Sequence, residues 1–511
     1  SNITMQFLER RYNRRADGYG GSLENRVRLL RELIEDTKQA VGDTCAVAVR
    51  FVVDELLGPD GMEIDGEAPE IIAMLAELPD LWDVNISDWP HDSQTARFAE
   101  EGYQERYTAF VKTLTSKPVV GVGRYTSPDH MASLIAKGAL DFIGAARPSI
   151  ADPFLPKKIE EGRIEDIREC IGCNICVSGD MTFTPIRCTQ NPTMGEEWRK
   201  GWHPERIPTR VSEDTVLIVG GGPAGLECAR ALGQRGYAVT LAEAGAAFGG
   251  RVRGESLLPG MASYQRVVEH RLSAFHKLPN VETYLASDLG AEEVIAFEAQ
   301  HIVLATGATW RRDGKGRTHR TGLPISASAP DIFTPDDIMA EQKPGQGPVL
   351  VYDDERYIMA GLIAEKLAHD GYAVTFMTPA TMVSPWTENT LEQHAIQRRL
   401  LEAGITIVTD RQLVSLDGGT RHACIYTGRE VESDAESVVL VTSRISSDSL
   451  WRELQTRAGD GTAPWKSLTR IGDALAPATV AHAIYAGHRY AREFDTEAPA
   501  GAPYLRERVT V

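Results

Sequence analysis

Four of the seven cysteines lie within nineteen residues and carry the most specific chemical signal in the sequence. Cys170, Cys173 and Cys176 are each separated by two residues, and Cys188 follows twelve residues later. Three thiolates at this spacing can bind one face of an iron–sulfur cube, and a fourth closes it. Zinc sites more often use pairs of Cys, or Cys with His. The spacing therefore favours a 4Fe–4S cluster over the alternatives, which are zinc, disulfides and inert thiols.

A glycine-rich turn is the second signal. Gly220, Gly222 and Gly225 form a G-x-G-x-x-G pattern between an apolar strand pattern and a helical one. Glycines let the backbone approach a pyrophosphate, and the helix N-terminus favours its negative charge. Glu243, about twenty residues further on, can accept hydrogen bonds from a ribose diol. Because strand, turn and helix occur in the required order, the sequence predicts an adenine-nucleotide site rather than a plain tight turn.

Later positions complete this site, and a second unit differs from it. Gly307 ends a strand-to-turn pattern, and Asp473 is expected at the end of a strand, where it can bind sugar hydroxyls. A second β–α unit starts at Pro348, but residues 353–357 (DDERY) stand where glycines are expected. Three carboxylates would repel a pyrophosphate. The second unit is therefore predicted to be a nucleotide-binding type of fold without a nucleotide.

The first 165 residues alternate apolar strand patterns with amphipathic helical patterns. Strands are expected at residues 45–53, 81–86, 118–122 and 141–144, and helices at residues 25–41 and 103–115. Repeated β–α units of this kind form a parallel sheet with helices outside it. Four units make half of an eight-stranded barrel. We therefore predict the C-terminal half of a (β/α)8 barrel and expect a further segment before Ser1.

The whole chain of 511 residues is predicted to be an α/β protein with two Rossmann-like domains after the barrel portion. We expect the barrel portion at 1–165, the cluster segment at 166–210, the first part of the ADP-binding domain at 211–335, the second Rossmann-like domain with a degenerate site at 336–450, and the return to the ADP-binding domain with a C-terminal tail at 451–511.

Composition excludes several classes of partner. The balance of 54 Lys and Arg against 72 Asp and Glu gives a net charge of −18, which disfavours nucleic acid and anionic membranes. No apolar run approaches the ~18 residues that a transmembrane helix needs. No basic and apolar leader starts the chain. We therefore expect a cytoplasmic protein with neither a nucleic-acid nor a membrane partner.

Beyond these motifs, the sequence resembles the iron–sulfur flavoproteins that include the trimethylamine, dimethylamine and histamine dehydrogenases and the 2,4-dienoyl-CoA reductases. Residues 13–26 (NRRADGYGGSLENR) are similar to the loop and helix after the fourth strand of their barrel. Residues 121–125 (GVGRY) and 144–148 (GAARP) are similar to the loops that hold the FMN phosphate.

This resemblance implies an FMN site in the barrel portion. The residues implied are Gly123, Arg124, Ala146 and Arg147 at the phosphate, with Arg50 at the edge of the flavin ring. Arg50 is expected at the end of its strand, where a cation would stabilise the anionic reduced flavin. The alternative is that the three arginines form surface ion pairs.

A third signature separates the branches of the family. Residues 188–191 (CTQN) and 195–205 (GEEWRKGWHPE) closely resemble the amine dehydrogenases. The dienoyl-CoA reductases bring electrons in from NADPH through the second nucleotide domain, which here lacks the glycines. The resemblance therefore implies an amine dehydrogenase that binds ADP structurally, in place of FAD or NADPH.

The resemblance also implies a substrate site. Trp89 is similar to one wall of an aromatic cage that attracts alkylammonium groups. Asp180 stands at a position where the trimethylamine enzymes have Trp. The histamine dehydrogenases resemble this chain at both positions, with Trp at the position of Trp89 and Asp at the position of Asp180. An Asp can pair with a second cationic group on the substrate. Asp92 resembles the carboxylate of a Tyr–His–Asp trio. Its partners, and the Cys that links FMN covalently in this family, would lie before Ser1. Trp89 as a packing residue and Asp180 as a solvated residue stay open.

The implied reaction is oxidative deamination of a small amine. Histamine fits best, giving imidazole acetaldehyde and ammonia, with electrons passing from FMN to the 4Fe–4S cluster and on to an electron-transferring flavoprotein. The resemblance also implies a homodimer. The alternatives are a dimethylamine or trimethylamine dehydrogenase, an NAD(P)H-dependent enoate or 2,4-dienoyl-CoA reductase, and a non-catalytic electron-transfer or scaffold subunit.

Overall fold

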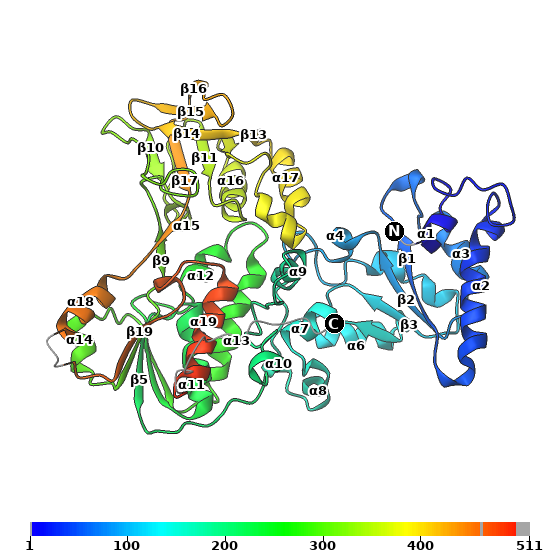
Figure 1. Cartoon of the computed structure of the whole chain (residues 1–511), viewed down its shortest axis with the longest axis horizontal. Helices are drawn as coiled ribbons and strands as arrows, with labels where there is room; N and C mark the ends of the chain where they lie inside the picture. The colour runs from blue at the N-terminus through cyan, green and yellow to red at the C-terminus, as the bar shows by residue number, and fades with distance from the viewer. Residues whose placement is uncertain (1–2, 460–462, 497–511) are drawn as a thin grey trace, which may run out of the picture.

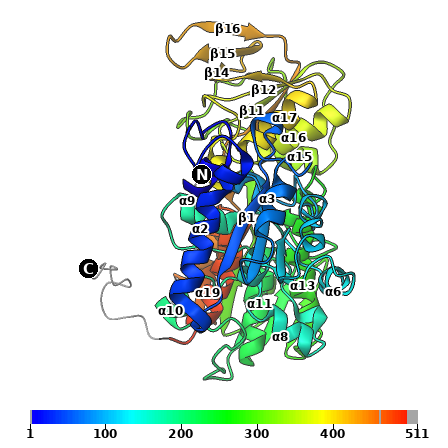
Figure 2. The same ribbon diagram turned by 90° about the vertical axis from the view of Figure 1, so that its right-hand side faces the viewer.

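Three parallel sheets organise the chain in the computed structural model, which describes residues 3–459 and 463–496. Figure 1 shows the barrel portion at the right, the glycine-turn domain at the lower left and the second nucleotide-type domain at the top. Turned by 90°, the same molecule presents the barrel portion to the viewer, in front of the glycine-turn domain (Figure 2). None of the helices in the described ranges is long and apolar enough to cross a membrane.

The barrel portion contains an open parallel sheet in the order β1-β2-β3-β4, as the sequence predicts. Its strands are β1 (Ala48–Asp54), β2 (Leu81–Ile86), β3 (Val119–Val122) and β4 (Phe142–Gly144). Its helices are α1 (Ile3–Leu8), α2 (Leu23–Val41), α3 (Ala68–Leu75), α4 (Trp89–Asp92), α5 (Glu105–Thr108), α6 (Pro128–Ala136), α7 (Ala146–Ala151) and α8 (Leu155–Glu160). Ser22 caps α2, because its side chain accepts a hydrogen bond from the backbone N–H of Asn25.

Two details of the barrel portion differ from expectation. Arg50 lies in the middle of β1 rather than at its end. The strand starts at Ala48, which pairs with Leu81 of β2, and it continues four residues past Arg50 to Asp54. The helix expected at 103–115 is interrupted: α5 ends at Thr108 and a short 3-10 turn follows. The Thr108 hydroxyl donates to the Gln104 carbonyl at 3.2 Å, a local side-chain bond of the kind that competes with a regular helix.

The glycine-turn domain has a parallel sheet in the order β19-β8-β5-β6-β7. Its strands are β5 (Thr215–Val219), β6 (Ala238–Ala242), β7 (Val281–Tyr284), β8 (His301–Leu304) and β19 (Ser467–Arg470). The cluster segment before it carries α9 (Ile175–Met181) and α10 (Glu197–Lys200), and the domain itself carries α11 (Pro223–Arg235), α12 (Arg251–Glu255), α13 (Arg266–Phe275), α14 (Ala291–Ala296), α18 (Ser449–Ala458) and α19 (Val480–Glu493). The chain therefore returns to this sheet near its C-terminal end, through β19.

The second domain has a parallel sheet in the order β10-β17-β11-β12-β13 and an antiparallel one in the order β14-β15-β16. The strands are β10 (Asp331–Phe333), β11 (Val349–Asp353), β12 (Val374–Met377), β13 (Thr406–Val408), β14 (Arg411–Ser415), β15 (Thr420–Cys424), β16 (Glu430–Ser433) and β17 (Ser437–Val441), with helices α15 (Pro335–Met339), α16 (Met359–His369) and α17 (Gln393–Glu402). The antiparallel pair β9 (Ala308–Trp310) and β18 (Arg444–Ser446) connects the two domains. The sheet begins with β10, before the boundary expected at residue 336.

A buried ionic cluster joins three helices of the glycine-turn domain. Glu227 on α11 lies 2.8 Å from Arg271 Nε on α13 and 2.8 Å from His488 Nδ1 on α19, and it also pairs with Arg230. Burial alone would raise the pKa of Glu227, but the two guanidinium groups outweigh it and hold the pKa well below its ordinary value. The carboxylate is therefore ionised in the folded protein at neutral pH.

We expect Glu227→Gln to lower the free energy of unfolding by about 3–5 kcal/mol, since it leaves two buried cations without their partner. The folded-state pKa lies below the unfolded value of about 4.3, so this stabilisation is complete above that pH and is lost as the pH falls through the folded pKa. Urea unfolding at pH 7 and at decreasing pH measures both effects. Glu269→Gln, at an exposed position on α13, is the control. Equal free energies of unfolding for the wild type and Glu227→Gln at pH 7 would contradict the expectation.

Candidate functional site

The carboxyl ends of the four barrel-portion strands surround a cleft of about 450 Å³. Seven residues singled out from the sequence line it: Arg50, Trp89, Asp92, Gly123, Arg124, Ala146 and Arg147. In parallel barrels this end of the strands carries the chemistry. The structure therefore brings together every candidate of the barrel portion.

Two arginines supply positive charge to this cleft. Arg124 is buried, and its Nη2 donates to the Ala99 carbonyl at 2.7 Å. Its Nη1 is buried with no hydrogen-bond partner among the residues that the structure describes. Arg147 Nη1 donates to Asn174 Oδ1 at 2.7 Å, in the cluster segment. An unpartnered guanidinium nitrogen in a cleft lined by Gly123 fits a phosphate group, so the residues present fit the expected FMN.

Asp92 and Arg50 form an ion pair in the cleft. Arg50 Nη2 lies 3.3 Å from Asp92 Oδ2, and Arg50 Nη1 lies 3.6 Å from Asp83 Oδ2. Asp92 Oδ1 also accepts from Gln104 Nε2 at 2.9 Å. His91 Nδ1 lies 2.6 Å from Asp88 Oδ1, so among the described residues the Asp92 carboxylate is oriented by Arg50 and Gln104 rather than by a histidine.

The structure does not place Asp180 beside Trp89. Trp89 begins α4, lines the cleft and is 42% exposed, as a side chain available to a ligand must be. Asp180 is exposed in the last turn of α9 and does not line this cleft. The reason is the direction of α9: its residues 177–179 are buried, and the helix reaches solvent at Asp180. A shared substrate cage formed by Trp89 and Asp180 therefore stays a prediction.

The four cysteines of the cluster motif line one small cavity together with Arg147, Asn174, Thr189 and Gln190. The backbone N–H of Gly172 donates to Cys170 Sγ at 3.3 Å, and Thr189 Oγ1 lies 3.2 Å from Cys173 Sγ. Asn174 donates to the Thr390 carbonyl at 3.0 Å, which holds the motif against the second domain. The sequence spacing thus corresponds to a closed pocket of four thiols.

The chemistry of this donor set fits the expected iron–sulfur cluster, because four thiols line one cavity. Burial raises the pKa of Cys173, Cys176 and Cys188 to about 12, so a cationic metal centre is needed to keep these thiolates ionised. Within residues 3–459 and 463–496, no three His, Cys, Asp or Glu side chains are spaced to hold one metal ion.

A cavity of about 550 Å³ lies over the glycine-rich turn. Gly220, Gly222, Glu243 and Gly307 line it, and Gly220 has a φ of 107° that favours glycine. Glu243 Oε2 accepts from the backbone N–H of Gly221 at 2.7 Å, which fixes its carboxylate at the end of β6. Open backbone at the start of α11 suits a pyrophosphate, and the carboxylate suits a ribose.

Gly225 and Asp473 also make structural contacts around this cavity. Gly225 does not line the cavity; a Cβ there would lie 1.9 Å from the Gly220 carbonyl oxygen, so Gly225 lets α11 pack directly against the turn. Asp473 lines the cavity from a short 3-10 helix after β19. Its Oδ2 lies 2.7 Å from Arg444 Nη1 and 3.1 Å from Arg251 Nε. These arginines already occupy the carboxylate that was expected to bind sugar hydroxyls.

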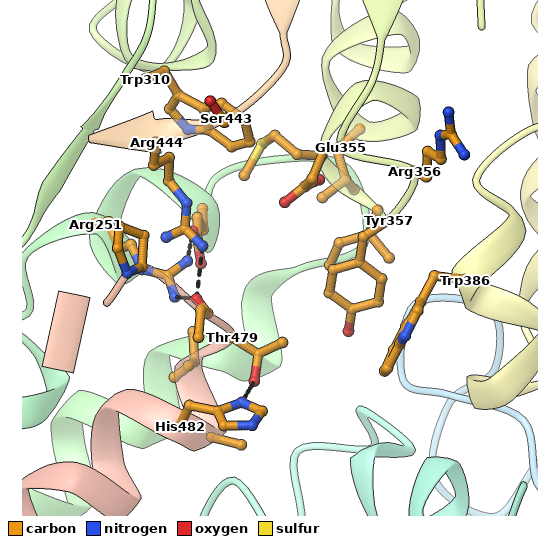
Figure 3. Close-up of a pocket in the computed structure, with 18 of the residues that line it drawn as sticks. Arg251, Trp310, Glu355, Arg356, Tyr357, Trp386, Ser443, Arg444, Thr479 and His482 are labelled. Carbon is orange, nitrogen blue, oxygen red and sulfur yellow. Dashed lines mark hydrogen bonds and ion pairs between the residues drawn. The ribbon is translucent and has the colours of Figure 1, made fainter. Parts of the chain in front are cut away.

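A cavity of about 810 Å³ between the glycine-turn domain and the second domain was not expected from the sequence (Figure 3). Glu355, Arg356 and Tyr357, from the stretch that replaces the glycines, form part of its wall. The signal that could have found it is this stretch itself. It follows β11, and ligands of open parallel sheets bind at the carboxyl ends of the strands.

Family models match three parts of the chain. Residues 2–166 match the NADH:flavin oxidoreductase / NADH oxidase family, residues 218–287 match the NAD(P)-binding Rossmann-like domain, and residues 333–425 match the OYE-like second alpha/beta domain. These matches confirm the expected α/β fold class, with an FMN-barrel type of domain followed by two nucleotide-type domains.

Similar proteins oxidise amines. The chain is 52% identical to histamine dehydrogenase from Rhizobium sp. 4-9, covering 100% of this chain and 75% of that one with a TM-score of 0.97. It is 48% identical to 6-hydroxypseudooxynicotine amine oxidase from Pseudomonas geniculata N1, covering 97% and 74% with a TM-score of 0.93. It is 39% identical to dimethylamine dehydrogenase from Hyphomicrobium sp. (strain x), covering 99% and 73%.

Proposed function

We propose a function from the premise that this chain belongs to the flavoprotein family of the trimethylamine, dimethylamine and histamine dehydrogenases, and so is an oxidoreductase that acts on amines. The proposal is that it deaminates a small amine, with histamine as the preferred substrate. FMN in the barrel cleft, a 4Fe–4S cluster on the four cysteines and ADP over the glycine-rich turn are the proposed cofactors.

One observation carries the proposal. Arg147 lines both the cleft at the strand ends and the cavity of the four thiols. Its Nη1 donates to Ser93 and Gln94 beside the cleft and to Asn174 inside the cysteine motif. A substrate cleft and a cluster site joined by one side chain are what an enzyme needs if electrons taken from an amine are to leave through a cluster.

The residues of the cleft have distinct roles in this proposal. Arg124 and Arg147 hold the phosphate of FMN, and Arg50 places a positive charge near the ring. When bound, FMN supplies the two-electron oxidation of the amine to an imine, which water hydrolyses to the aldehyde and ammonia. Trp89 attracts the substrate ammonium through its ring face, and Asp92 faces the same cleft as a carboxylate. The electron acceptor would be an electron-transferring flavoprotein, and the enzyme a homodimer, as in the family resemblance.

The choice of histamine rests on the sequence resemblance at Trp89 and Asp180 and on the 52% identity to a histamine dehydrogenase. Asp180 stays a candidate partner for the second cationic group of the substrate, although it does not line the cleft. Oxidation of 6-hydroxypseudooxynicotine is the second candidate, because the identity to the 6-hydroxypseudooxynicotine amine oxidase is nearly as high at 48%.

A dye-reduction screen tests the proposal. Histamine is expected to reduce the dye faster than dimethylamine, trimethylamine or 6-hydroxypseudooxynicotine, and NADPH with an enoate is expected to give no turnover. Asp180→Asn should lower kcat/KM for histamine by about tenfold, the value of one charge-assisted contact. Asp370→Asn, an exposed position after α16, is the matched control. If histamine is inert while a methylated amine turns over rapidly, the substrate assignment is wrong.

A further inference from the structure

The 810 Å³ cleft between the two nucleotide-type domains is distinct from the proposed amine, cluster and ADP sites, although it shares Arg251 with the ADP cavity and Thr189 with the four-thiol cavity. Its charge is strongly unbalanced. Five arginines line it (Arg251, Arg317, Arg320, Arg356 and Arg444), against two glutamates (Glu255 and Glu355). A cleft of this composition attracts anions.

Three of these arginines are available to a ligand. Arg251 and Arg444 are paired with Asp473. Arg317 and Arg320 are exposed and have no ion pair with any residue that the structure describes. Arg356 has a single long ion pair, 3.7 Å to Asp354, and its Nε is buried without a hydrogen-bond partner among the described residues. Positive charge therefore remains unmatched in this cleft.

Aromatic rings face the same space. Tyr357 and Trp386 form an edge-to-face pair with centroids 4.8 Å apart on one side of the cleft. Trp310 lies on the opposite side, with the Arg444 guanidinium 5.6 Å from its ring centroid (Figure 3). Two further polar atoms, Glu355 Oε2 and Thr442 Oγ1, are buried without a described partner. Rings on two sides with unmatched polar atoms between them suit a flat aromatic ligand that carries polar groups.

The cleft adjoins the four-thiol cavity. Thr189 lines both, and its Oγ1 lies 3.2 Å from Cys173 Sγ. Ile175, the neighbour of Cys176, also lines the cleft. A ligand here would thus be separated from the thiols by about one residue, on the side of the cysteine motif that faces the second domain.

We propose that this cleft binds an anionic, planar aromatic electron acceptor of the quinone or quinone-imine class, as a second acceptor besides the electron-transferring flavoprotein of the proposed function. The electron-transfer part rests on the proposed function, whereas the binding part does not. The amine loses two electrons and two protons on becoming the imine, and the acceptor gains two electrons and two protons to become its hydroquinone or leuco form. The arginines bind the anionic groups, and Trp386, Tyr357 and Trp310 contact the ring system.

Calorimetric titration tests the binding part. The full-length protein, saturated with ADP, is titrated with anthraquinone-2,6-disulfonate. Arg356→Gln and Arg317→Gln are each expected to weaken binding by about tenfold, and Trp386→Leu by about fivefold. Arg398→Gln is the control, because Arg398 is exposed on α17 and pairs with Glu402 outside the cleft. Binding that is unchanged in both cleft arginine variants overturns the proposal, as does displacement of the probe by further ADP or by NADPH.

Steady-state kinetics test the electron-transfer part. Histamine is oxidised with either 2,6-dichlorophenolindophenol, an anionic dye, or the ferricenium cation as acceptor. We expect the ratio of the dye KM to the ferricenium KM to rise about tenfold in Arg317→Gln and Arg356→Gln but not in Arg398→Gln. An unchanged ratio overturns the acceptor role. Failure of the amine to reduce either acceptor would instead count against the proposed function, because the titration with the sulfonated quinone does not depend on amine oxidation.

Discussion

Replacing Cys173 by Ser is expected to remove most of the iron from the protein. Cys173 is one of four thiols in a closed cavity, and its Sγ also contacts the Thr189 hydroxyl. We expect the wild-type protein to hold about four iron and four sulfide per chain, and Cys173→Ser to retain less than about half of each, because hard oxygen is a poor substitute for thiolate at iron–sulfur clusters. Metal and sulfide analysis of the purified proteins measures this.

The control for this prediction is Cys45→Ser. Cys45 is exposed and lies outside the four-thiol cavity, so its loss should leave the iron content unchanged. Zinc in place of iron in the wild-type protein would show that the spacing of the cysteines was misinterpreted. An unchanged iron content in Cys173→Ser would show that this thiol is not a ligand.

The second large effect is expected at Gly225. A Cβ at this position would lie 1.9 Å from the Gly220 carbonyl oxygen, a backbone atom that cannot move aside without distorting the turn. Gly225→Ala should therefore destabilise the domain by about 1–3 kcal/mol or more and remove bound ADP. Gly222→Ala is a matched comparison, because the nearest atom to its Cβ would be Gly250 Cα at 3.9 Å.

The Gly225→Ala and Gly222→Ala variants should therefore differ in stability. Gly222→Ala should fold with nearly wild-type stability but bind ADP more weakly, since Gly222 lines the cavity where the backbone must approach the pyrophosphate. Thermal unfolding and nucleotide analysis of denatured extracts separate the two effects. Wild-type stability and ADP content in Gly225→Ala would contradict this account of the turn.

The elements with a strong local signal were predictable from the sequence. β2 has the expected bounds, and α11 and its Gly236 C-cap follow the glycine turn as the motif requires. The four cysteines were identified from spacing alone, because their positions within one loop are fixed by local geometry. Seven residues of the barrel portion that the family resemblance implied line one cleft, where the carboxyl ends of parallel strands share one edge of a sheet.

What could not be predicted depends on long-range packing. The exposure of Asp180 follows from the direction in which α9 leaves the cysteine motif, and no local pattern encodes that direction. The ion pair between Asp473 and Arg251 joins residues more than two hundred positions apart along the chain. The large cleft forms where two domains face each other, which the sequence does not reveal. From the sequence, the residues Glu355–Tyr357 that form part of its wall could be interpreted only as the loss of a nucleotide site.

The central claim is that electrons enter this protein from an amine at the barrel cleft rather than from a reduced nicotinamide nucleotide. Anaerobic titration of the holoenzyme, followed by the absorbance of its bound flavin, tests this most directly. The account predicts that histamine bleaches the flavin absorbance as soon as each addition is mixed in. It also predicts that NADPH leaves the flavin absorbance unchanged. Bleaching by NADPH, with no response to histamine, methylated amines or 6-hydroxypseudooxynicotine, would contradict it.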